Sequence, residues 1–440
     1  MRRSIFAVAF AAAVACGGVA LAQDTNVWTL NANGFWSFTN NWSPNTNYPN
    51  SVGAVAIVTN NNTSDQTIYL TNSITLGTLL WGDANRANFH GLRSTNAIVS
   101  TVTFDTGSDG RPALFVHGTG DRPNHDFGRY DDRTDVGILV NDTDGLFIDN
   151  WQTFYFRGLD NGLSTDPARA FNGGGNNVNK GEDGYLAFSR LVTNVGTWWQ
   201  RDGFTELFVQ GNPALKPTIS NLVLGVAPGV VDTGANPDGV LTNVNEGGAY
   251  DRVQLPYFSI VGAASTNGGL PMTNDMEVTF NRGIFRSLAR SVRDVSNTAV
   301  ATLPVYTGDF TLNGSANESI FIIEHQNSGG NTGVIKQTIF TGEFKGEGGF
   351  TKIGTGEMTL TASNSFTGDV NINRAFDNGR GRYGGVGLRE NGTLSGVNQI
   401  TLNRDGQLYL DNSAINLSNR VNDLAAITTR GRSQIEILAN

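Results

Sequence analysis

The side chains with the clearest capacity for chemistry cluster between residues 121 and 135, where Asp, Arg and His alternate. Within that cluster Asp131, Asp132 and Asp135 carry the carboxylates that a hard cation such as calcium prefers, beside groups able to abstract a proton. The cluster matches no recognised ligand spacing, and its mixed charges are typical of a solvated loop that pairs with itself. We therefore expect no metal and no cofactor, and we keep a calcium site at these aspartates as the alternative.

Other catalytic patterns are missing from the sequence. The four histidines are scattered, and no pair has the spacing of a zinc motif. Neither a Gly-x-Ser-x-Gly nucleophile turn nor a phosphate-binding Gly-Lys-Thr loop occurs. The one cysteine, Cys16, lies in the N-terminal leader described below, so the mature chain would have no thiol nucleophile. The sequence therefore favours a protein that is not an enzyme.

Tryptophans give the best indication of binding. Trp28, Trp36 and Trp42 lie close together in an Asn-rich segment, and Trp198 and Trp199 form a second group. Exposed rings would stack on sugars, whereas buried rings would cap the open end of a coil of stacked strands. We favour a cap for the first group, because it stands near the expected mature N-terminus. For Trp198 and Trp199 both interpretations stay open.

Arginines recur at helical spacing between residues 282 and 293. The apolar residues of the same segment, from Ile284 to Val295, show the matching period and predict a short amphipathic helix. Arg286 and Arg290 on its polar face could bind an anionic glycan or lipopolysaccharide. We favour a solvated face, or pairing with the acidic body of the protein.

The N-terminus has the features of a secretory signal peptide. Arg2 and Arg3 precede an apolar run over residues 5–15, and Ala20-Leu21-Ala22 offers a cleavage site, so residues 1–22 are expected to be removed. The run is too short to span a bilayer and no second one follows, which predicts a mature chain without a transmembrane segment. Residues 13–17 loosely resemble a lipobox, which leaves lipidation at Cys16 as the alternative to simple secretion.

Composition narrows the fold class. The 440 residues include 55 Gly and 12 Pro and carry a formal net charge of −9. Glycine has no triplet period, and the chain is poor in the residues of coiled coils, so neither a collagen nor a coiled coil is expected. The acidic balance argues against a nucleic-acid partner, because phosphate binding requires a basic face.

Short bursts of apolar alternation separated by Asn, Gly, Asp and Thr predict strands. The clearest examples are residues 357–361, 369–373, 399–403, 407–411, 414–418 and 434–438. Their outward Thr, Asn and Asp residues suit ladders between stacked coils better than a closed sandwich. We therefore predict an all-β protein, a right-handed parallel β-helix with protruding loops and the one short helix.

Residues 348–373 read Gly-Gly-Phe-Thr-Lys-Ile-Gly-Thr-Gly-Glu-Met-Thr-Leu-Thr-Ala-Ser-Asn-Ser-Phe-Thr-Gly-Asp-Val-Asn-Ile-Asn. The segment resembles the autotransporter-associated β-strand repeat. The resemblance implies a parallel β-helix in a large exported bacterial surface protein, with no catalytic residue attached to the repeat. We expect glycines at tight corners and Lys352 as a solvated charge. The residues that fall on the pattern are Gly349, Thr351, Lys352, Gly354, Gly356, Leu360, Asn364, Thr367 and Gly368.

These features divide the chain into four parts. They are a signal peptide at 1–22, a Trp-rich cap with the first strands at 23–110, an irregular β-helix with loop excursions at 111–340, and the repeat region at 341–440. We predict an exported, non-catalytic scaffold of the cell surface or extracellular matrix, with surface glycans or other copies of itself as partners. The alternatives are a polysaccharide lyase or glycoside hydrolase on the same scaffold, and a glycan-binding module.

Overall fold

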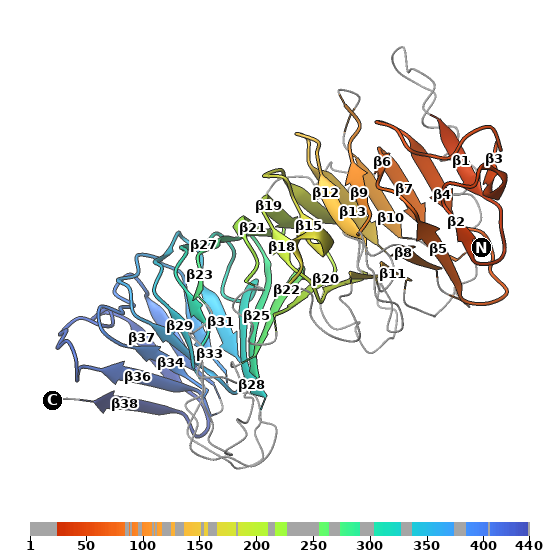
Figure 1. Ribbon diagram of the computed structural model, residues 1–440. Coiled ribbons are helices and arrows are strands. Elements are labelled where there is room, and N and C mark those ends of the chain that lie inside the picture. Colours follow the sequence, from red (N-terminus) through yellow and green to blue (C-terminus); the bar gives the residue numbers. More distant parts are fainter. Residues whose placement is uncertain are drawn as a thin grey trace, which may run out of the picture.

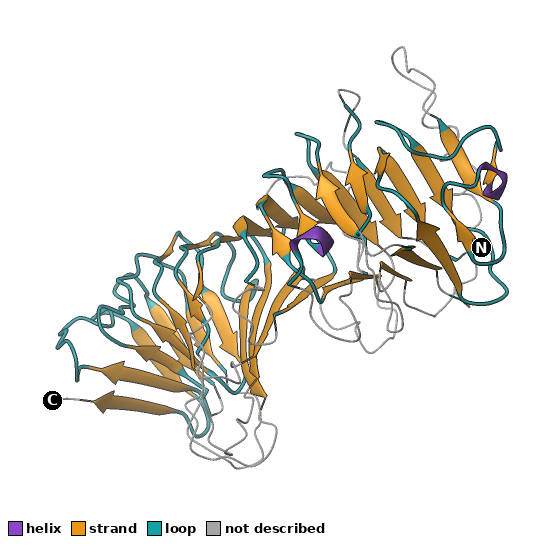
Figure 2. Cartoon of the chain, viewed as in Figure 1, coloured by secondary structure: helices purple, strands orange, loops and turns teal. Residues whose placement is uncertain are grey.

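The structure is a computed structural model of the 440-residue chain. It describes residues 24–83, 88, 90–95, 99–107, 110, 112–116, 125–127, 136–150, 154–156, 165–181, 184–209, 216–226, 255–263, 273–290, 303–326, 337–373, 384–403 and 405–438. These residues form an all-β protein in which strands follow one another along an elongated body (Figures 1 and 2). Helical structure in this part of the chain consists of two short 3-10 turns, η1 (Thr39–Asn41) and η3 (Pro167–Arg169).

Two long sheets run through the described residues. The 12-stranded sheet has the order β3 (Trp42–Ser43), β1 (Thr25–Trp28), β4 (Val55–Val58), β7 (Thr78–Trp81), β10 (Ala113–Val116), β13 (Leu146–Asn150), β16 (Val178–Gly181), β19 (Val195–Gln200), β21 (Ile219–Leu224), β24 (Glu277–Phe280), β27 (Phe310–Leu312) and β30 (Phe344–Lys345). The 14-stranded sheet has the order β2 (Gly34–Phe35), β5 (Gln66–Leu70), β8 (His90–Ser94), β11 (His125–Phe127), β14 (Phe154–Phe156), β17 (Tyr185–Phe188), β20 (Phe204–Phe208), β22 (Tyr257–Ala263), β25 (Gly283–Arg290), β28 (Ser319–Gln326), β31 (Phe350–Ile353), β33 (Val370–Ile372), β35 (Gln399–Leu402) and β37 (Ala426–Thr429).

Two smaller sheets complete the body. A 5-stranded sheet has the order β18 (Val192–Thr193), β15 (Phe171–Asn172), β12 (Gly137–Val140), β9 (Thr101–Phe104) and β6 (Ile74–Leu76). A 7-stranded sheet has the order β23 (Thr273–Asn274), β26 (Val305–Tyr306), β29 (Gln337–Phe340), β32 (Glu357–Leu360), β34 (Val386–Leu388), β36 (Gln407–Asp411) and β38 (Gln434–Leu438). Neighbouring strands of a sheet are not consecutive in the sequence, because the chain passes through at least one other sheet before it returns. We call each circuit of the chain, from one strand of a sheet to the next strand of the same sheet, a layer.

Pairing between layers is parallel and keeps side chains of one kind in rows. Among the strand pairs of the described residues, β1–β3 alone is antiparallel. In the 14-stranded sheet Phe258 pairs with Phe285 and Phe285 with Phe321, and all three rings are fully buried. In the 12-stranded sheet Phe310 pairs with Phe344, and their rings stack at 4.7 Å. Because alternate residues of a strand point to opposite faces, such rows build one continuous core along the body.

The helix expected over residues 284–295 is wrong for its described part. Residues 283–290 form β25, which pairs in parallel with β22 on one side and β28 on the other. Phe285 points into the core, whereas Ile284 and Leu288 lie on the outer face and are still only 3% and 7% exposed. Burial of both faces produced an apolar pattern that imitated the helical period. Val292 and Val295 lie outside the described residues.

Lys352 is not the solvated charge that the sequence suggested. It lies on β31 in the row that contains Phe321 and Ile372, and its side chain is 0% exposed. Its ammonium group donates hydrogen bonds to the carbonyl oxygens of Gly354 at 2.7 Å and Gly384 at 2.5 Å. Strand alternation places this side chain inward, and nearby carbonyls then satisfy its donors.

Strand prediction in the repeat region is confirmed except at one place. Strands β32, β33, β35, β36 and β38 fall on the predicted segments, whereas residues 414–418 form a loop. That segment alternates as a strand would, but the buried guanidinium of Arg420 binds the carbonyl oxygens of Asp411 and Ile415. Within the loop, the Ile415 carbonyl is therefore held by a side chain.

Two glycines of the repeat lie at close approaches between layers. Gly354 has a φ of +92°, a region that favours glycine, and a Cβ there would lie 2.3 Å from the carbonyl oxygen of Ile323. A Cβ on Gly368 would lie 2.3 Å from the backbone of Gly348 in the adjacent layer. Substitution at either position would force two layers apart.

The two ends of the described body differ. Near the N-terminal end Trp28, Trp36 and Trp42 are each 1% exposed and pack edge to face. The indole N–H of Trp36 donates to the carbonyl of Pro49, and that of Trp42 donates to the carbonyl of Trp36. These rings thus belong to the core and present no face to a sugar. At the other end the inward row continues to Ile435 and Ile437, which are 41% and 65% exposed.

Candidate functional site

The structure does not describe the side chains of four residues that the sequence singled out. Asp131, Asp132 and Asp135 lie outside the described residues, as does the side chain of Arg290. Within the part of the chain that the structure covers, no group of three or more His, Cys, Asp or Glu side chains could hold a metal ion. No helix among these residues is long and apolar enough to cross a membrane.

Trp198 and Trp199 lie on opposite faces of β19. Trp198 is 0% exposed and packs among core aromatic rings, and its indole N–H donates to the side chain of Gln200 at 3.0 Å. Trp199 is half-buried, with its N–H donated to the carbonyl of Gly225 at 3.0 Å. The guanidinium of Arg201 lies 4.4 Å from the Trp199 ring centroid and covers one face. Trp198 therefore offers no ring to a ligand.

Arg286 braces three layers on the outer face of the 14-stranded sheet. Its Nε and Nη2 donate to Glu324 at 2.9 and 2.7 Å, and its Nη1 lies 3.5 Å from Glu206. The second oxygen of Glu206 accepts from the hydroxyl of Tyr185. Burial raises the pKa of the neighbouring Tyr257, which keeps that phenol neutral. Arg286 is thus paired within the protein, which is one of the two arrangements that the sequence favoured.

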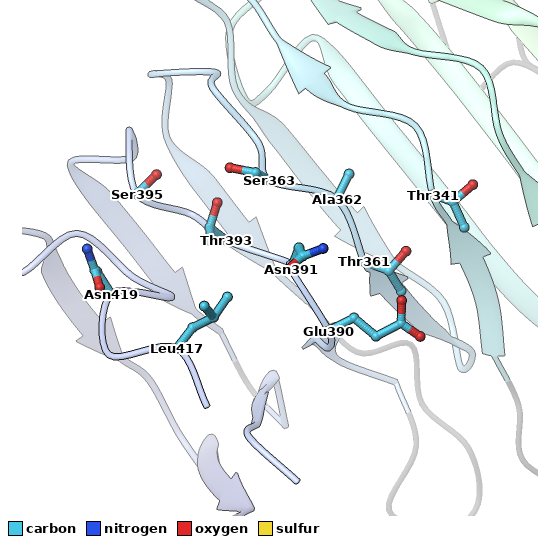
Figure 3. A pocket seen from close by; sticks show the side chains of 10 residues that line it. All are labelled: Thr341, Thr361, Ala362, Ser363, Glu390, Asn391, Thr393, Ser395, Leu417 and Asn419. Carbon is cyan, nitrogen blue, oxygen red and sulfur yellow. The ribbon is translucent and has the colours of Figure 1, made fainter. Parts of the chain in front are cut away.

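A groove of about 720 Å³ crosses the turns that follow strands of the 7-stranded sheet (Figure 3). Four successive layers contribute to it, at residues 341, 361–363, 390–395 and 417–419. Most of its lining is uncharged: hydroxyls, the amides of Asn391 and Asn419, and the apolar side chains of Ala362 and Leu417. Among the described residues that line it, Glu390 alone carries a charge, and none is basic. The hydroxyl groups come from Thr341, Thr361, Ser363, Thr393 and Ser395.

Glu390 occupies an unfavourable backbone conformation. It follows β34 in a turn closed by the N–H of Gly392, which donates to the carbonyl of Arg389 at 2.7 Å. Its φ is +48°, a value that tight turns usually assign to Gly, Asn or Asp, and the side chain is exposed. For an L-residue with a Cβ and no local hydrogen bond, this region costs on the order of 1 kcal/mol.

The preceding residue fixes this turn to the sheet. Nη1 of Arg389 donates to Asp411 at 2.7 Å, and Nη2 donates to Glu357 at 3.1 Å. The Glu357 side chain is 3% exposed and passes over Gly387, where a Cβ would lie 2.2 Å from its carboxylate. Arg389 therefore ties together the layers of β32, β34 and β36, and it holds Glu390 at the groove.

Buried polar side chains hold the backbone that forms the floor and one wall of the groove. Asn364 accepts from the backbone N–H of Phe344 at 2.8 Å and donates to the carbonyl of Thr393 at 2.9 Å. Arg420, 2% exposed, donates to the carbonyl of Gly392 at 2.9 Å as well as to those of the 411–415 loop. The lining of the groove is thus anchored by hydrogen bonds to buried side chains.

The sequence did not single out Glu390, Arg389 or Arg420. Glu390-Asn391-Gly392 after an alternating strand does indicate a turn, but the usual preference would place the positive φ on Asn or Gly. Asn364, in contrast, was singled out as a repeat residue, and the structure places it directly beneath the groove.

The chain was compared with known proteins in three ways. No family model matched it, and neither did a curated protein or a solved structure. The resemblance of residues 348–373 to the autotransporter-associated repeat therefore stays a prediction.

Proposed function

We propose that the chain is a right-handed parallel β-helix that acts as an exported, non-catalytic scaffold at the cell surface or in the extracellular matrix. The observation that carries this proposal is the parallel, in-register pairing of layers around one continuous core. Crossovers between parallel strands are nearly always right-handed, which supports the handedness. A stack of this kind gains length by repetition and exposes loops along its sides, properties that suit a scaffold.

Export is tested by expressing the full chain, with a C-terminal tag, in a Gram-negative host. We expect tagged protein outside the cytoplasm whose mass corresponds to a chain beginning at Gln23, after removal of residues 1–22. If the mature chain instead begins at a lipid-modified Cys16, the protein is anchored to a membrane and not secreted in free form. Retention of the uncleaved chain in the cytoplasm would contradict the proposal.

A carbohydrate-cleaving enzyme is the second candidate, because two carboxylates meet at Arg286 on one face of the body. Glu206 and Glu324 are both engaged by the same guanidinium, and Glu206 also accepts a hydrogen bond from Ser259. This arrangement supports a brace between layers more than an acid and base pair with space for substrate. We expect no new reducing or unsaturated ends when the mature chain is incubated with a panel of polysaccharides. Release that Glu206→Gln abolishes would establish the enzyme instead.

A further inference from the structure

The groove combines a strained acidic residue with a lining of hydroxyls and amides. Glycine at position 390 would adopt the observed φ of +48° without strain, yet the chain places a carboxylate there, among the side chains that line the groove (Figure 3). Residues held in such conformations cluster at functional sites. The Glu390 side chain, held by the neighbouring anchored Arg389, is therefore the group from which we infer a ligand.

The charge and polarity of the lining select the class of ligand. The described lining has one carboxylate and no basic group, which disfavours nucleic acids and anionic glycans, because these need cationic partners. A peptide docking as an added strand needs an open sheet edge, whereas β32, β34 and β36 beside the groove are paired on both sides. Neutral sugars present hydroxyls that both donate and accept, and this lining offers both kinds of partner.

We propose that this groove binds a neutral polysaccharide, whose ring hydroxyls donate hydrogen bonds to the Glu390 carboxylate. The proposal rests on the proposed function in one respect, that an exported scaffold would meet such a ligand. Hydroxyls of Thr341 and Thr361 already donate to carbonyls of the preceding layer, at 3.4 and 3.3 Å, so their oxygens are oriented to accept. Adjacent layers lie about 4.8 Å apart, so the four layers span about 14 Å, enough for a short oligosaccharide along the body.

Binding is tested with the mature full-length chain and a panel of neutral hexaoses of glucose, mannose and galactose, by isothermal titration calorimetry. We expect at least one neutral hexaose to bind, and galacturonate hexaose not to bind. Glu390→Gln keeps the shape of the side chain but removes its charge, and it should weaken binding at least about tenfold. Glu390→Gly should abolish the same contact while raising the urea midpoint of unfolding, because the backbone strain is relieved.

Asp405→Gly is the matched control, since Asp405 also has a positive φ, +58°, and lies outside the groove. It should leave hexaose binding unchanged. The proposal is overturned if no neutral hexaose binds the wild-type chain, or if both Glu390 variants bind as tightly as wild type. Tighter binding of a cationic glucosamine hexaose would overturn the assignment to a neutral glycan. Binding by a chain that is not exported would refute only the scaffold function, whereas export without binding would refute only this site.

Discussion

Asn364 offers a direct test of how the layers are held together beneath the groove. The 12-stranded sheet ends at β30, and beyond that strand the Asn364 side chain takes the place of a neighbouring strand. Its oxygen accepts from the N–H of Phe344 and its nitrogen donates to the carbonyl of Thr393. The side-chain amide therefore imitates a peptide group and extends the hydrogen-bond ladder across three layers.

The Asn364→Ala substitution should leave these two buried backbone groups without partners. At about 1–3 kcal/mol for each unsatisfied group, and allowing for partial relaxation, we expect a loss of about 2–4 kcal/mol. Since layers contact only their neighbours, the loss should be local. All tryptophans lie at or before residue 199, so indole fluorescence would not report it. Hydrogen exchange followed by mass spectrometry would detect this local loss of stability. Peptides covering residues 340–370 should exchange about 30- to 1,000-fold faster.

Two further variants test whether the Asn364 amide itself is responsible for this effect. Asn364→Asp keeps the acceptor toward Phe344 but places an oxygen against the carbonyl of Thr393, so it should be more destabilising at neutral pH than at a pH where the carboxyl is protonated. Asn371→Ala, which loses one long contact of 3.3 Å to Thr351, should change exchange very little. If exchange in Asn364→Ala stays within about threefold of wild type, the peptide-like role of this side chain is refuted.

Three other substitutions probe separate parts of the body. In Gly387→Ala the new Cβ would lie 2.2 Å from the Glu357 carboxylate and should push it away from Arg389. We expect the unfolding free energy to fall by about 1–2 kcal/mol. A double-mutant cycle should show a smaller loss in an Arg389→Met background. Burial opposes ionisation of Asp411, but hydrogen bonds from Ser413 and the charge of Arg389 hold its pKa below the ordinary value. Asp411→Asn should therefore be destabilising at neutral pH and approach wild type as the pH falls below about 4, which urea titrations at several pH values would show; a difference independent of pH would contradict this cause. Trp36→Ala should accelerate exchange in residues 24–60 while leaving residues 340–438 unchanged, whereas Phe38→Ala, at a side chain 57% exposed, should affect neither; a global loss of protection in Trp36→Ala would show that the layers unfold as one unit.

Strands and their two faces were largely predictable from the sequence, because alternation is a local property. Segments 357–361, 399–403 and 407–411 carry apolar residues at every second position and form β32, β35 and β36. Alternation failed where the opposite face was also buried, as in β25, or where a buried guanidinium took the carbonyls, as at 414–418. Lys352 shows the related limit, since a charged residue in an inward position is normally assumed to be solvated.

The groove was not predictable for a different reason. Its residues meet because Phe340 pairs with Leu360, Leu360 with Leu388 and Leu388 with Leu410, and the intervals between these partners are unequal. Unequal layers mean that no fixed period in the sequence brings Thr361, Glu390 and Asn419 to one place. Register between layers is instead set by contacts such as Asn364 with Thr393 and Arg389 with Asp411, which themselves join residues far apart in the chain. The position of a site on such a body depends on the register between layers more than on a sequence motif. Substitution of a side chain that fixes this register should therefore alter ligand binding, although that side chain does not contact the ligand.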